Sequence, residues 1–168
     1  MLFRSGENLA LSVSPVALNP DQPQETRLGA LHWRGGVALS GQHKSFGGYS
    51  GMAIAPDMAR LRAISDTGTW LMLGLRYDGA GNLVGAERAM LGPLLDVGGK
   101  ALKFSDEADA ESLALLADGS LLVGFERRHR LWRYPPGREE DGMGLAGRWR
   151  CPPHPICIWR PSMKAWKP

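Results

Sequence analysis

The sequence predicts an all-β fold built from two similar units of antiparallel strands. Glycine (22) and proline (12) are frequent among the 168 residues, and apolar runs are short. This composition favours many short strands over helices. Turns rich in Asp and Gly separate the apolar runs. The third observation is that one stretch of the chain matches a later stretch at a nearly fixed offset, which is typical of proteins built from repeated units.

Residues 1–25 are expected to form an extended lead-in, because Pro15, Pro20 and Pro23 interrupt any periodic pattern. Residues 26–39 alternate well enough to predict a strand near 26–34, or two strands around Gly35-Gly36.

The repeat follows this region. Residues 51–57 (GMAIAPD) match residues 112–118 (SLALLAD) at an offset of 61, and residues 61–66 match residues 121–126 at an offset of 60. The change of offset means that the second copy has one residue fewer in its first turn. We expect three strands in each copy, near 49–55, 61–65 and 69–77 in the first and near 111–116, 121–125 and 129–134 in the second.

The first copy adds a turn, residues 78–82 (DGAGN), and a fourth strand near 83–90. A repeated four-stranded meander is typical of a propeller blade. We therefore predict an incomplete β-propeller over residues 26–147, with about two four-stranded antiparallel blades and no helix longer than two turns. The repeat exceeds the usual ~40–50 residues, and the excess is an insertion at residues 91–108. The alternative is a β-sandwich with a chance internal match.

The basic residues are unevenly distributed. Five of them and no acidic residue lie in residues 148–168, which leaves 15 basic and 17 acidic groups in residues 1–147. The formal charge of +3 therefore belongs to the end of the chain. This distribution argues against a nucleic-acid partner. No apolar run is long enough for a membrane span, and the first eight residues lack the apolar region of a signal peptide.

Residues 148–168 are expected to be an irregular tail foreign to the fold. They hold both cysteines, Cys151 and Cys157, with His154 between them. This spacing matches no standard zinc site and offers only three ligands. Reading the codons of residues 149–168 in another frame accommodates a sequence that would start a third blade. We therefore expect this tail to be the product of a frameshift.

Four stretches resemble the family described as esterase-like activity of phytase: residues 46–57 (FGGYSGMAIAPD), 64–68 (ISDTG), 108–116 (ADAESLALL) and 125–134 (FERRHRLWRY). The family pattern resembles F-G-G-x-S-G, S-D-x-G, A-D-x-E-x-L-A and F-E-R-x-H-R-x-x-x-Y, in this order. The resemblance covers about residues 13–134. It implies a propeller about twice as long as this chain, usually exported to the periplasm or the cell exterior. It also implies hydrolysis of esters or phosphoesters, with acidic side chains holding calcium, which then binds phosphate.

The repeat also indicates candidate site residues. Ser50 and Glu111 fall on the same position at the start of the first strand, and Asp66 and Glu126 fall on the same position after the second. The ends of these strands meet at one face of a propeller. We therefore expect four carboxylates to converge there with a basic segment. The metal candidates are Asp66, Asp109, Glu111 and Glu126, and the catalytic candidates are Arg127, His129 and Arg130, beside Arg128.

Two interpretations of this cluster remain. Hard oxygen ligands suit calcium or magnesium, and Arg127 or Arg130 would stabilise negative charge. The same carboxylates and arginines can instead form ordinary ion pairs between blades. A serine hydrolase is disfavoured, because Ser50 does not lie in the G-x-S-x-G motif of a nucleophile elbow.

Two functions follow from these interpretations. The parent protein is either a metal-assisted hydrolase of small esters or phosphoesters, or a non-catalytic propeller that binds a ligand or partner. In both cases we expect the 168-residue chain to be inactive, because two blades leave exposed sheet edges and no closed channel.

Overall fold

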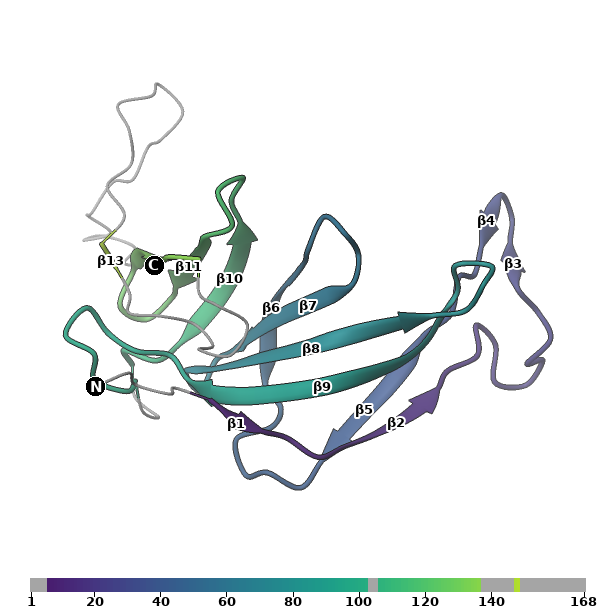
Figure 1. The fold of residues 1–168 in the computed structure, drawn as a ribbon, viewed down its shortest axis with the longest axis horizontal. Coiled ribbons are helices and arrows are strands. Elements are labelled where there is room, and N and C mark those ends of the chain that lie inside the picture. The colour runs from purple at the N-terminus through teal and green to yellow at the C-terminus, as the bar shows by residue number, and fades with distance from the viewer. Residues whose placement is uncertain (1–5, 103–105, 137–146, 149–168) are drawn as a thin grey trace, which may run out of the picture.

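The computed structural model of the chain describes residues 6–102, 106–136 and 147–148. Within these ranges it contains strands and no helix (Figure 1). The strands are β1 (Glu7–Asn8), β2 (Leu11–Pro15), β3 (Arg27–Leu28), β4 (Leu31–His32), β5 (Val37–Gly41), β6 (Tyr49–Ile54), β7 (Arg60–Ser65), β8 (Thr69–Tyr77), β9 (Leu83–Pro93), β10 (Ala110–Leu115), β11 (Leu121–Phe125), β12 (Arg130–Tyr134) and β13 (Gly147–Arg148).

The largest sheet has five antiparallel strands in the order β1-β9-β8-β7-β6. Strands β6 to β9 follow one another as a meander, and β1 pairs with the outer edge of β9. The β8–β9 turn is closed by the Asp78 carboxylate, which accepts the N–H groups of Ala80 at 2.9 Å and Asn82 at 2.8 Å. Such local acceptance is the reason that Asp favours turns.

The second sheet repeats this plan in the order β10-β11-β12-β13. The first turns of the two units match closely. The N–H of Ala55 donates to Arg60 O at 2.8 Å, and at the equivalent place Leu116 donates to Ser120 O, also at 2.8 Å. Both turns contain a residue with positive φ, Met58 in the first unit (59°) and Gly119 in the second (81°). Both also contain an aspartate that accepts a backbone N–H two residues later.

The five-stranded sheet is covered on both faces. On one face, Ile64 and Trp70 pack against a buried cluster from the second sheet that includes Val123, Phe125 and Tyr134. On the other face, residues such as Leu71 and Leu73 pack against the two-stranded sheet β2–β5. The strand β6 therefore lies beside β10, where the two units meet.

Two side chains donate hydrogen bonds to the backbone where the first unit leads into the second. The indole of Trp70 donates to Pro93 O at 3.0 Å, and the hydroxyl of buried Tyr134 donates to Leu95 O at 3.1 Å. The predicted insertion, residues 91–108, thus contributes buried residues to the core, among them Leu94, Leu102 and Ala108.

The prediction of an all-β chain is confirmed for the described residues, and the strands predicted in the two repeats lie within one to three residues of those observed. The single strand preferred for residues 26–34 is wrong. The structure has the hairpin β3–β4 there, because Gly29 adopts a φ of 61° and reverses the chain. Strands β1, β2 and β13 were not predicted, and β5 corresponds to the second strand of the alternative with two strands around Gly35-Gly36.

Some predictions concern residues that the structure does not describe. The predicted foreign tail, apart from Arg148 in β13, lies outside the described residues, and so do Cys151, His154 and Cys157. In the part of the chain that the structure describes, no helix is long and apolar enough to cross a membrane.

Candidate functional site

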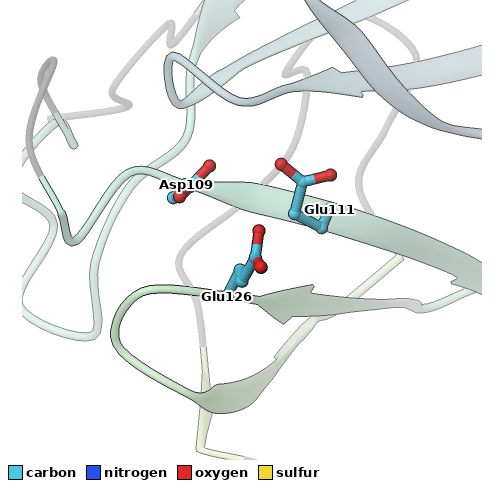
Figure 2. A group of neighbouring side chains, drawn as sticks. All are labelled: Asp109, Glu111 and Glu126. Atoms are coloured by element: carbon cyan, nitrogen blue, oxygen red, sulfur yellow. The ribbon is translucent and has the colours of Figure 1, made fainter. Parts of the chain in front are cut away.

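Three acidic side chains meet at one end of the second sheet. Asp109 directly precedes β10, Glu111 is the second residue of β10, and Glu126 directly follows β11. Since β10 and β11 are antiparallel, the start of the first lies beside the end of the second. The backbone N–H of Glu126 donates to Asp109 O at 2.9 Å and fixes this juxtaposition. One carboxylate oxygen from each residue lies within 4.8 Å of the other two (Figure 2).

A β-bulge determines where Glu111 lies. The pairing of β10 with β11 shifts by one residue between Ala110 and Ser112, so that Glu111 is the extra residue on its strand. The pairing of β6 with β7 shifts at the matching position, between Tyr49 and Gly51. Bulges bend a strand locally and redirect the side chain of the extra residue. The repeat thus brings a redirected residue to the same end of both units.

Glu111 lies among other negative charges of the cluster. Desolvation raises the pKa of the Glu111 carboxyl above its ordinary value, and the nearby carboxylates of Asp109, Glu126 and Asp66 raise it further. Carboxylates that approach one another disfavour the ionised form unless a cation intervenes. The side chain of Glu111 is exposed, so solvent screens part of this repulsion.

Asp109 is the most enclosed member of the cluster, with 14% of its side chain exposed. Its carboxylate accepts from Arg127 Nε at 2.9 Å, and the same guanidinium reaches Asp106 at 3.3 Å. These carboxylates raise the pKa of Arg127. In the neighbouring Arg128, the Nη1 atom lies 4.0 Å from Oε1 of Glu107. A row of arginine–carboxylate pairs therefore borders the cluster.

The oxygen donors of the cluster could hold a metal ion. Calcium binds carboxylate oxygens at about 2.3–2.6 Å, so two ligands on opposite sides of one ion lie up to about 5 Å apart. The three oxygens within 4.8 Å satisfy this limit. Hard oxygen donors favour calcium or magnesium over softer metals.

A comparison with known protein families gives a match. The family model described as "Phytase-like: Esterase-like activity of phytase" matches residues 44–155, about two thirds of the chain. The chain belongs to this family. No curated protein and no solved structure matches it.

The phytase-like match includes all seven residues that the sequence nominated, and the structure brings three of the four metal candidates together. The fourth, Asp66, follows β7 at the position equivalent to Glu126. Its carboxylate lies over Gly48, where an added Cβ would be only 2.4 Å from Asp66 Oδ1. Asp66 is thus near enough to influence Glu111 electrostatically, but it is not one of the three clustered ligands.

The three catalytic candidates of this phytase-like chain lie in different surroundings. Arg127 contacts Asp109 directly. His129 is exposed in the turn between β11 and β12. Arg130 lies over two aromatic rings, with its Cζ atom 3.7 Å from the centroid of Phe125 and 4.2 Å from that of Trp132. The catalytic roles of all three stay predictions.

Arg130 also bonds to the backbone. Its guanidinium donates to Arg128 O at 2.9 Å and to Glu107 O. Burial lowers the pKa of Arg130. These contacts hold the β11–β12 turn and the acidic segment before β10 together, so Arg130 supports the shape of the cluster.

Sequence reasoning missed two contributors to this site. Ser50, set aside because it lacks the nucleophile-elbow motif, donates its hydroxyl to Ala110 O at 2.5 Å and connects the first unit to the strand that carries the cluster. Asp106 shares Arg127 with Asp109. The signal for Ser50 was present, because it occupies the same repeat position as Glu111. Asp106 belongs to an acidic run, residues 106–111, that could have suggested its role.

Proposed function

We propose that the two units are neighbouring blades of a β-propeller, and that the acidic cluster is part of a calcium-dependent site for small esters or phosphoesters. The architectural part rests on the repeated strand order, the matching bulges and the matching turns of the two units. Face-to-face packing of successive four-stranded meanders is the arrangement of propeller blades. Family membership supports the same interpretation.

The functional part rests chiefly on the three carboxylate oxygens within 4.8 Å of one another. The raised pKa of Glu111 supports it, because that carboxyl lies among negative charges that a cation would neutralise. Asp109, Glu111 and Glu126 would hold the ion. A bound calcium ion would supply positive charge that polarises an ester carbonyl or a phosphate oxygen.

Arg127 is the residue of this chain best placed to contact an anionic substrate. Its guanidinium is 67% exposed and lies at the edge of the cluster, held there by Asp109 and Asp106. A fixed guanidinium can donate hydrogen bonds to phosphate or to a developing oxyanion. Asp109 would orient this arginine while also contributing an oxygen to the ion.

Calcium binding is the first test of this proposal. Titration calorimetry should detect one ion per chain in the wild type, and Glu111→Gln should weaken binding at least tenfold, since even outer-shell substitutions cost about that much. Glu87→Gln is the matched control, because this exposed glutamate on β9 pairs with Arg88 far from the cluster. Absence of calcium binding, or equal weakening by both variants, would contradict the metal site.

Turnover is the second test. Calcium-dependent hydrolysis of p-nitrophenyl acetate or p-nitrophenyl phosphate, lost in Glu111→Gln and in Arg127→Gln, would support a hydrolase. Because we expect the two units alone to be inactive, it is calcium binding without turnover in the longer parent protein that would favour the second candidate function, a propeller that binds ligands without catalysis. One observation favours this alternative: Asp109 and Arg127 already satisfy each other as an ion pair.

A further inference from the structure

The hairpin β3–β4 projects from the body of the molecule at the end far from the acidic cluster (Figure 1). Among the named strands, β3 and β4 contact only each other. The backbone turns at Gly29, where an added Cβ would meet no atom within 4 Å. The tip of this hairpin is therefore surrounded by solvent.

The projecting tip is apolar. Its four residues, Leu28, Gly29, Ala30 and Leu31, are all exposed, and we call them the leucine tip. Leu28 is 65% exposed and Leu31 is 70% exposed, more than any other large apolar side chain that the structure describes. Paired leucines at the end of a projecting hairpin have no role in the core of this chain and cost free energy in water. This arrangement indicates a surface that the tip enters.

One basic residue, Arg27, lies directly behind the tip. Arg27 and His32 form the cross-strand pair next to Leu28 and Leu31, and both are exposed. One residue of strand corresponds to about 3.3 Å. When the leucines reach the acyl boundary of a bilayer, these longer side chains lie at the level of the lipid headgroups. An apolar end followed by an arginine matches the polarity profile of an anionic membrane interface.

We propose that the leucine tip inserts into the interfacial region of anionic lipid bilayers and attaches the chain peripherally. The shape of the tip favours a lipid surface over a protein. A convex tip two leucines wide buries little area against a flat protein surface, whereas specific protein contacts need about 800 Å² from each partner. A fluid interface accommodates such a tip without a matching pocket. The attachment does not depend on the acidic cluster.

Co-sedimentation of the full chain with vesicles tests this proposal. We expect binding to vesicles of equal parts phosphatidylcholine and phosphatidylglycerol, and weaker binding to phosphatidylcholine alone. Leu28→Asp combined with Leu31→Asp should weaken binding at least about tenfold through loss of apolar burial. Arg27→Gln should weaken it about fivefold, on anionic vesicles only. Met52→Asp is the matched control, because Met52 is 63% exposed on β6 and lies away from the hairpin.

Three results would overturn the proposal: no sedimentation of the wild type with anionic vesicles, unchanged sedimentation of the double aspartate variant, or equal loss in Met52→Asp. Sedimentation velocity without lipid provides a fourth. A dimer that the double aspartate variant abolishes, together with no vesicle binding, would show that the leucine tip contacts a second copy of the chain instead. Circular dichroism confirms that each variant retains its strands.

Discussion

Ser50 and Glu111 occupy the same structural position in the two units, and across the junction Ser50 contacts the residue that precedes Glu111. Each is the extra residue of a β-bulge at the start of the first strand of its unit. The Ser50 hydroxyl donates to Ala110 O at 2.5 Å, one residue before Glu111. The bulge therefore serves two purposes: in the first unit it directs a hydroxyl that joins the units, and in the second it directs a carboxylate into the acidic cluster.

The first prediction concerns this junction. Ser50→Ala removes the hydroxyl that binds Ala110 O, and a hydrogen bond of this kind contributes about 1 kcal/mol. We expect the free energy of unfolding to fall by about 1 kcal/mol in urea titrations. Ser40→Ala, at an exposed serine of β5, is the control and should change stability by less than about 0.5 kcal/mol. Equal effects of the two substitutions would mean that the Ser50 bond does not couple the units.

The second prediction concerns Glu111 and pH. Its pKa is raised in the folded state, so ionising it costs the folded state free energy. This cost is absent below the unfolded pKa of about 4.3 and is complete above the folded pKa. Glu111→Gln, measured without calcium, should therefore stabilise the protein at pH 7 and have no effect near pH 4. Because the side chain is exposed, the gain should stay below about 1 kcal/mol.

Thermal unfolding from pH 4 to pH 8 measures this difference. Glu87→Gln is the control, since its carboxylate accepts hydrogen bonds from Arg88 and lies outside the cluster. A destabilised Glu111→Gln at pH 7 would mean that Glu111 has a stabilising partner. Saturating calcium should reverse the sign of the effect, since the ion would then require the carboxylate.

The repeat explains how much of the fold was predictable. Strands β6 to β8 and β10 to β12 follow from apolar runs that recur at offsets of 61 and 60 and are separated by turn residues such as Asp57 and Asp118. Strands β1 and β13 have two residues each, too few to show any periodicity. Their pairing depends on edges that the tertiary structure provides. In β2, the presence of Pro15 concealed a strand that ends at that proline.

The site was predictable in its residues and less so in its geometry. The chain order places Asp109, Glu111 and Glu126 where antiparallel strands meet, which is sufficient to bring them together. The same argument placed Asp66 with them, and it did not foresee that the carboxylate lies over Gly48. The roles of bonded side chains depend on rotamers, which the sequence pattern does not contain.

The third prediction separates a structural role of Arg130 from a catalytic one. Its guanidinium lies over the rings of Phe125 and Trp132, and a partly desolvated cation–π contact contributes up to about 2 kcal/mol. Arg130→Met keeps much of the apolar stem and loses the charge and the backbone bonds. We expect a loss of about 1–3 kcal/mol in chemical denaturation. Arg127→Gln removes an exposed ion pair and should cost less stability than Arg130→Met. If Arg127→Gln destabilised the protein more than Arg130→Met, the contacts of Arg130 would not be important for the stability of the turn.

The last prediction uses two glycines with nearly the same backbone conformation. Gly48 has a φ of 63° and Gly29 a φ of 61°, so replacement by alanine costs each the same left-handed backbone penalty of about 1–2 kcal/mol. Their surroundings differ. An added Cβ meets Asp66 Oδ1 at 2.4 Å at Gly48 and no atom within 4 Å at Gly29. Gly48→Ala should therefore be clearly more destabilising than Gly29→Ala. If the excess comes from the contact with Asp66, it should disappear when both substitutions are compared in an Asp66→Ala background. An excess that survives in that background would mean that the contact between Gly48 and Asp66 does not cause it.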